Sequence, residues 1–320
     1  CGLVTQVVHI PTLNNLTHLF RITHLYNVLT EAGKHAQSKI AAELALQAGK
    51  FAFVEKPIAL NLYDTDRIIA ADEAAGGGKV MVGYMRRYAS AFVDAVREVG
   101  TFEQVRYARV RDIIGPNSVF VSQSGTFPRT FGDYSKEDEE ELRRKTEADV
   151  QRALEEEVGV RATEGTRMMW ETLSMLGSHD LSAMREMLGV PEGVVGFSPC
   201  QTTGSPAIFK YPTFSVSYES GVDQVPRFNA SIEIFGDKKT VKMVIDTPFV
   251  KGLPTTMVVK EALEDGSYRE STIRRTYEDP FTLELREMWE WVNGGRVPKT
   301  TPRDARTDLE VLGMLMRAVK

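Results

Sequence analysis

The short apolar run from Phe51 to Val54 constrains the fold most, because Glu-Lys-Pro follows it directly at residues 55–57. Before it lies Ala41–Lys50, a run rich in Ala and Leu that closes on a glycine, the residue that most often ends helices. We therefore predict a helix, a glycine stop and a short buried strand. Ligands bind beyond the carboxyl ends of strands in open α/β sheets. Lys56, delivered at such an end, is a candidate for proton transfer, since a desolvated lysine shifts its pKa readily.

The bulk composition is that of a globular protein. Its 320 residues suffice for two domains, and a net charge of −5 favours neither nucleic acid nor an anionic membrane as partner. Cys1 and Cys200 provide neither a disulfide framework nor metal-ligand spacing, so we expect a reducing, cytoplasmic compartment. No apolar run reaches the roughly 18 residues of a membrane span.

The chain begins at Cys1-Gly2 without a methionine and looks like a fragment whose first strand is missing. A glycine followed by apolar residues at helical spacing fits a strand-to-helix turn that places backbone amides against a pyrophosphate. Gly2 would be the second glycine of the dinucleotide fingerprint, and Thr5 stands where the third is expected. Gly2, Leu3 and Val4 are thus candidate cofactor-binding residues, although a simple turn would explain Gly2 equally well.

Phe20–Val28 alternates as a strand does, with Asn27 near its end. Dinucleotide-binding folds often hold an acid there for the adenosine ribose. Asn27 brings no charge, so it selects weakly between NAD and NADP, and it also fits an ordinary strand-end turn. Only 28 residues (55 − 27) separate Asn27 from Glu55, too few for two further strands with their crossovers. Either the sheet is small, or a segment has been lost near Ala41-Ala42.

A second strand end carries a cluster of polar side chains. A helix is expected over Asp64–Ala75, a buried strand over Lys79–Gly83 and a helix over Ala89–Val99. Between the last two, residues 84–88 read Tyr-Met-Arg-Arg-Tyr, which suits a ligand rich in hydroxyl groups. The alternative is an arginine-rich loop that makes surface ion pairs.

Beyond Gly100 the pattern changes to runs of strands separated from helices, which indicates an α+β domain on an antiparallel sheet. Strands are expected at Glu103–Asp112, Val194–Phe197, Ala207–Phe209, Thr213–Tyr218, Asn229–Phe235, Lys239–Ile245, Met257–Glu264 and Tyr268–Thr276. Helices are expected at Ser135–Gly159, Met168–Gly189, Phe281–Val292 and Arg303–Lys320, with an irregular loop over Ile113–Tyr134.

We therefore predict a truncated Rossmann-like domain over residues 1–100 and an α+β domain over 101–320, whose last helix, 303–320, packs back on the first. Helices should cover one face of the antiparallel sheet. The other face is a natural interface for a homo-oligomer.

Three motifs together resemble the Gfo/Idh/MocA oxidoreductases, the family of glucose–fructose oxidoreductase and inositol dehydrogenase. They are Ala-Gly-Lys through Val-Glu-Lys-Pro at 48–57, Gly-Tyr-Met-Arg-Arg-Tyr at 83–88 and Gly-Ser-His-Asp at 177–180. The runs Val8–Leu13 and Leu176–Leu181 are similar to a fungal-type branch of that family.

The resemblance implies hydride transfer between NAD or NADP and a hydroxyl-bearing carbon of a sugar, a cyclitol or a similar small molecule. Lys56 would contact the nicotinamide ribose and the reacting oxygen, and His179 would donate and accept the proton. Glu55 and Pro57 would join Lys56 at the cofactor, while Tyr84, Arg87 and His179 would bind the substrate.

One departure from the family pattern concerns the imidazole. The family usually places an aspartate four residues before this histidine, and Met175 stands there. Asp180 faces another side of the helix, and Glu171, two turns before His179, is a conceivable substitute. The alternative interpretations are that His179 is a core histidine and that Lys56 is a surface partner of Glu55.

Two alternatives to an enzyme follow. One is a non-catalytic sensor of dinucleotide or ligand with the same fold, and the other is an inactive product of a truncated gene model. His9, His18, His24 and His35 show no metal-ligand spacing and are interpreted as structural, so no metal is expected.

Overall fold

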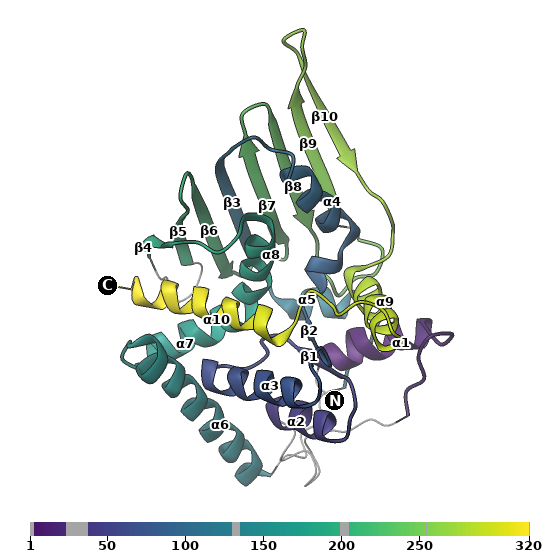
Figure 1. Cartoon of the computed structure of the whole chain (residues 1–320), viewed down its shortest axis with the longest axis vertical. Coiled ribbons are helices and arrows are strands. Elements are labelled where there is room, and N and C mark those ends of the chain that lie inside the picture. Colours follow the sequence, from purple (N-terminus) through teal and green to yellow (C-terminus); the bar gives the residue numbers. More distant parts are fainter. Residues whose placement is uncertain (1–2, 24–37, 130–134, 199–204, 254, 320) are drawn as a thin grey trace.

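A computed structural model describes residues 3–23, 38–129, 135–198, 205–253 and 255–319. It contains a two-stranded parallel sheet and an eight-stranded, predominantly antiparallel sheet with helices packed against it (Figure 1). The predicted fold class, a truncated Rossmann-type unit followed by a large antiparallel sheet, is confirmed.

The parallel sheet pairs β1 (Ala52–Glu55) with β2 (Val80–Gly83), and Val54 lies opposite Val82. Flanking it are α2 (Ser38–Gln47) and α3 (Leu62–Ala74). The side chain of Asn61 accepts from the Asp64 amide and so begins α3, as N-cap residues do. Parallel strands buried on both sides read as continuous apolar runs, which is why both strands were predictable.

The N-terminal segment is helical from Leu3 onward, with the π-helical turn η1 (Thr5–His9) leading into α1 (Ile10–Asn15). This agrees with the helix expected after Gly2, while Gly2 itself lies outside the described residues. The strand predicted over residues 20–28 is not formed at Phe20–Thr23. Asn27 also lies outside the described residues.

The eight-stranded sheet has the order β10-β9-β8-β7-β3-β6-β5-β4. Its strands are β3 (Val105–Ile114), β4 (Gly193–Phe197), β5 (Ser205–Lys210), β6 (Ser215–Val222), β7 (Phe228–Gly236), β8 (Lys239–Ile245), β9 (Thr256–Ala262) and β10 (Tyr268–Ile273). The pairing of β3 with β7 is antiparallel as expected, but β3 pairs with β6 in parallel.

The helical elements that follow β2 in the chain fill one side of this sheet and the space beneath it (Figure 1). They are η3 (Met85–Tyr88), α4 (Ser90–Val99), α5 (Asn117–Ser122), α6 (Lys136–Gln151), η4 (Arg152–Val158), α7 (Glu164–Thr172), η5 (Leu173–Gly177), α8 (Ser178–Leu188), α9 (Pro280–Val292) and α10 (Pro302–Arg317). The short helix α5 interrupts the segment expected to be an irregular loop.

The main core lies between the sheet and helices α4, α8 and α10, which contact β8, β3 and β4 respectively. Strand β3 alternates buried and partly exposed residues, so one face of the sheet is covered. Helix α10 also packs against α3, and its Ala305 is buried in the core of the parallel sheet. The junction between the two sheets is therefore held by α10 on one side.

Candidate active site

A cavity of about 450 Å³ opens where the carboxyl end of β1 meets the large sheet. Lys56 and Glu55 line it from β1, and His179 lines it from α8. Its volume lies in the range of small-molecule sites, roughly 300–1,000 Å³. The two residues that the sequence analysis singled out as catalytic are therefore brought to one cavity, although they lie far apart in the chain.

The Lys56 amine donates a hydrogen bond to the main-chain carbonyl of Met175 in η5. Burial lowers the pKa of Lys56 from 10.5 to about 8; the Glu55 carboxylate opposes this shift, and the Arg86 guanidinium adds to it. Lys56 is thus not an exposed partner of Glu55. It is an amine that can change protonation state close to neutral pH.

His179 is half-buried at the start of α8, and its Nδ1 atom has no hydrogen-bond partner among the described residues. Burial and the nearby Lys56 and Arg86 cations hold the pKa of His179 well below its usual range. The imidazole is therefore neutral at neutral pH. Glu171 also lines the cavity, and within the described part of the chain no hydrogen bond joins it to His179.

Arg86 forms a buried bridge behind the two candidate catalytic residues. Its Nη2 lies 2.9 Å from Asp112 Oδ2 on β3, and its Nη1 lies 2.5 Å from Asp180 Oδ1 on α8. Burial and the neighbouring Asp112 carboxyl raise the pKa of Asp180 well above its ordinary range, against the opposing effect of Arg86. One guanidinium between two buried carboxyl groups favours a proton shared by the acids.

Glu55 is fixed from the N-terminal segment. His9 Nε2 lies 2.7 Å from Glu55 Oε1, and the His9 ring meets those of Phe53 and Phe281 edge-on. Val4, near the start of the same helical segment, lines the cavity. The sequence predicts only a structural role for His9, because residues so distant in the chain as His9 and Glu55 share no local pattern that would indicate this contact.

Tyr84 and Arg87 are not among the residues that line this cavity. Arg87 is buried in ion pairs with Glu186, at 2.5 Å, and with Asp304. Tyr84 is 2% exposed, and burial together with Asp308 raises its pKa well above the ordinary value. Met85 and Arg86, the two residues between Tyr84 and Arg87 in the chain, line the cavity instead.

Leu3 and Pro57 also lie outside the lining of the cavity, and Gly2 and Asn27 lie outside the described residues. Residues that the sequence analysis did not assign to the site but that line it include Asn117, Thr172, Phe228 and Phe281. No cluster of His, Cys, Asp or Glu within the described residues fits a metal ion.

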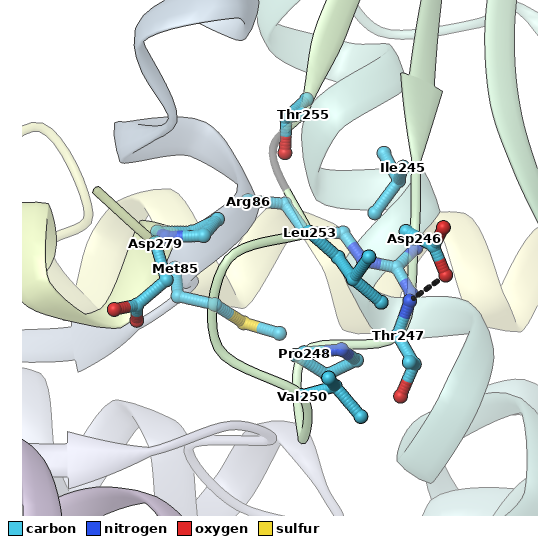
Figure 2. Close-up of a pocket in the computed structure, with 11 residues that line it drawn as sticks. Met85, Arg86, Ile245, Asp246, Thr247, Pro248, Val250, Leu253, Thr255 and Asp279 are labelled. Carbon is cyan, nitrogen blue, oxygen red and sulfur yellow. Dashed lines mark hydrogen bonds between the residues drawn. The ribbon is translucent and has the colours of Figure 1, made fainter. Parts of the chain in front are cut away.

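Met85 and Arg86 also line a second, much smaller cavity of about 10 Å³ (Figure 2). Asp246, Thr247 and Asp279 face it, and the Thr247 amide donates to Asp246 Oδ1 at 2.7 Å. That volume suffices for about one water molecule. Of these two cavities, the one lined by Lys56 and His179 has room for an organic ligand.

A short parallel sheet delivers a lysine to the edge of a large, predominantly antiparallel sheet, and solved oxidoreductases share this fold. A structure of aldose-aldose oxidoreductase from Caulobacter crescentus, complexed with glycerol, matches with a TM-score of 0.59 and 19% identity over 89% of this chain and 74% of that one. An oxidoreductase from Bacillus subtilis matches with a TM-score of 0.66 and 14% identity over 99% and 93%. These similarities establish the shared fold.

The sequence match is to inositol 2-dehydrogenases. The protein from Gluconacetobacter diazotrophicus is 37% identical over 95 residues, which cover 28% of this chain and 27% of that protein. Other curated inositol 2-dehydrogenases are matched over less than a fifth of their length. No family model matches the chain. The resemblance to the Gfo/Idh/MocA oxidoreductases is thus confirmed by sequence over part of the chain and by fold across nearly all of it. None of the helices in the described residues has the length and apolar character needed to cross a bilayer.

Proposed function

We propose that this chain is an NAD(P)-dependent oxidoreductase that transfers a hydride between a nicotinamide cofactor and a hydroxyl-bearing carbon of a sugar, a cyclitol or a similar small molecule. The observation that carries the proposal is that Lys56 and His179 line one cavity at the carboxyl end of β1. An amine and a neutral imidazole beside each other can stabilise an alkoxide and exchange its proton.

The residues of the cavity fit the nicotinamide half of a dinucleotide. The cavity is large enough for a ring, its ribose and a small substrate, and it lies beyond the carboxyl end of a parallel strand. Lys56, with Glu55 at its side and Val4 at the start of the N-terminal helix, would hold this half. Gly2, Leu3, Asn27 and Pro57 remain our proposed contacts to the rest of the cofactor. When bound, the cofactor would supply the two-electron acceptor or donor.

The substrate contacts are reassigned from the expectation. Tyr84 and Arg87 are committed to buried partners. We instead assign the recognition of substrate hydroxyl groups to the polar residues of the lining, Asn117, Glu171 and Thr172. Phe228 and Phe281 supply the apolar walls against which a ring can pack.

The family resemblance carries three wider proposals. Residues 1–100 form the dinucleotide-binding domain and 101–320 the substrate domain, the chain works in the cytoplasm, and the large sheet joins copies into a homo-oligomer. Exposed apolar side chains on its strands, including Val195, Ile208 and Val244, support the last of these.

A sensor of dinucleotide or ligand is the second candidate. The observation that favours it is Met175, whose exposed side chain stands where the family has a carboxylate. A site without that acid can bind a cofactor and yet turn over slowly.

The deciding experiment titrates the protein with NADH and NADPH and follows nicotinamide fluorescence. A polyol and cyclitol panel is then followed at the nicotinamide absorbance. Turnover that Lys56→Ala abolishes, and that Lys50→Ala at an exposed site before β1 leaves unchanged, supports the oxidoreductase. Cofactor binding without turnover supports the sensor, and no binding at millimolar cofactor rejects both the oxidoreductase and the dinucleotide sensor.

A further inference from the structure

The amine of Lys56 is held by a neutral main-chain group. Its acceptor is the carbonyl of Met175, which lies in the π-helical turn η5 (Leu173–Gly177) immediately before α8. π-helical turns inside helices are frequent at functional sites. Here the turn supplies an oxygen at the residue where the resemblance leads us to expect a carboxylate. The carbonyl orients the amine without adding a negative charge that would favour its protonated form.

Among the described residues, no acidic side chain forms a hydrogen bond to the His179 imidazole. Its Nδ1 atom is buried and, in the described part of the chain, unpaired. The adjacent acid, Asp180, places Oδ1 on Arg86 Nη1 at 2.5 Å, and among the described residues its Oδ2 makes no hydrogen bond to the imidazole. The cations Lys56 and Arg86 both act on His179, and no hydrogen bond from a carboxylate of the described residues stabilises an imidazolium.

The protonation of Lys56 and His179 depends on all the charged groups that surround them. Around them stand Glu55 at the end of β1, Arg86 in η3, Asp112 on β3, Glu171 on α7 and Asp180 on α8. Arg86 is largely neutralised by Asp112 and Asp180, which it bridges. Together these charges and the burial disfavour protonation of the His179 imidazole. The Lys56 amine, in contrast, can gain or lose its proton close to neutral pH.

We propose that Lys56, and not His179, exchanges the proton with the reacting oxygen in this chain, with the Met175 carbonyl as the positioning group. This inference rests on the proposed function. In the oxidation direction the O–H bond breaks and its proton goes to the neutral Lys56 amine, while the C–H bond breaks and its hydride, with both electrons, goes to the nicotinamide. In reduction the Lys56 ammonium returns the proton. His179 remains neutral and donates or accepts a hydrogen bond to the substrate.

The order of protonation is measured without substrate or cofactor. Lysines carrying ¹³C-methyl groups and histidines labelled at the ring are titrated by NMR, with Lys56→Met and His179→Gln used to assign their signals. Lys56 is expected to titrate near pH 8, well below the ordinary 10.5 of a lysine, and His179 below its ordinary 6.5. His179 titrating at or above 6.5, with Lys56 close to 10.5, overturns the proposal.

The pH dependence of kcat/KM for oxidation supplies the second readout. A rising limb near pH 8 is expected in the wild type and in His179→Gln, and it should disappear in Lys56→Met, whose rate falls by roughly 10²–10⁴-fold. A limb that survives in Lys56→Met and vanishes in His179→Gln assigns the proton to the histidine and overturns the inference, while the proposed oxidoreductase stands. Cofactor binding without turnover contradicts the proposed function, and the inference, which rests on that function, is overturned with it.

Met175→Asp tests the role of the neutral acceptor. Met175 is 59% exposed, so the change is tolerated sterically, and it introduces a carboxylate beside both residues. An opposite charge at this range favours the protonated form, so the Lys56 midpoint should rise by roughly one pH unit, and that of His179 should rise too. Met168→Asp is the matched control, since Met168 is 51% exposed on α7 and does not line the cavity. Equal Lys56 titration midpoints in Met175→Asp and Met168→Asp would contradict the positioning role of Met175.

Discussion

Arg86 Nη1 and Asp180 Oδ1 lie 2.5 Å apart in the interior of the protein, and this contact joins the strand end after β2 to the helix that carries His179. The same guanidinium also pairs with Asp112 on β3. The single cation of Arg86 therefore connects both β3 and α8 to the segment that follows β2. Both partners in the first contact are almost completely buried. The bridge therefore fixes α8, which carries His179, to η3, which follows β2.

Replacing Arg86 with methionine should destabilise the protein strongly. Methionine keeps much of the side-chain volume but leaves the Asp112 and Asp180 carboxyl groups without their cation. Removing one partner of a buried ion pair costs about 3–5 kcal/mol. Urea unfolding followed by circular dichroism measures the loss.

Arg106→Met is the control for that substitution. Arg106 pairs with Asp237 on the surface, where both side chains are substantially exposed. Surface pairs contribute little, so its urea midpoint should match that of the wild type. Equal midpoints for the Arg86 and Arg106 variants would show that the buried bridge does not stabilise the fold.

The strands and helices of the large domain were predictable because their signals are local. The hairpin at Asp265-Gly266 and the run of alternating strands before it follow from turn residues and a period of two. The parallel pairing of β3 with β6 was not predictable, since the two strands are far apart in sequence and no local pattern encodes their register. The strand expected over residues 20–28 is absent where the structure describes it, because alternation over so few residues is weak evidence.

The site was predictable only in part, for a related reason. Lys56 and His179 lie at ends of elements that the sequence marks clearly. The choice between Arg86 and Arg87 depends on η3, a 3₁₀ turn in which successive side chains point about 120° apart. From the sequence both arginines are equivalent, and the expectation selected Arg87, which is committed to Glu186 and Asp304. No pattern in the sequence indicated that His9 would hold Glu55.

Gly177→Ala should destabilise the start of α8. A Cβ atom there would lie 2.5 Å from the Tyr218 hydroxyl oxygen, too close for any contact without movement. Overpacking of this kind costs about 1–3 kcal/mol, and a shift of α8 would displace His179. Adding Tyr218→Phe removes the colliding oxygen and should recover much of the loss.

Gly193→Ala serves as the comparison for thermal unfolding of these variants. Gly193 has no atom within 4 Å of a built Cβ and no left-handed backbone, so its melting temperature should remain that of the wild type. A Gly177→Ala protein as stable as Gly193→Ala, or one that Tyr218→Phe does not rescue, would rule out the clash as the reason for glycine.

The buried carboxyl group of Glu284 should make the stability of the protein depend on pH. It is fully buried on α9, and neither carboxyl oxygen has a hydrogen-bond partner among the described residues. Burial, assisted by the Glu55 carboxylate, raises the pKa of Glu284 well above its ordinary 4.5. Below pH 4.5 the folded and unfolded states both hold the proton. Above it the unfolded state releases the proton while the folded state keeps it, so the free energy of unfolding falls as pH rises, by up to about 1.4 kcal/mol per pH unit for this group.

Glu284→Gln removes this titration and should flatten the decline of stability between pH 5 and pH 7, because the amide stays neutral in both states. Asp180 and Asp308 have raised pKa values as well. Their contribution to the decline of stability with pH should therefore remain in the Glu284→Gln variant. Glu290→Gln, at an exposed position of the same helix, should leave the curve unchanged. Denaturant midpoints measured at half-unit pH intervals compare the three proteins. If the Glu284 and Glu290 variants show the same slope as the wild type, Glu284 is ionised in the folded protein and the assignment of its neutral state is wrong.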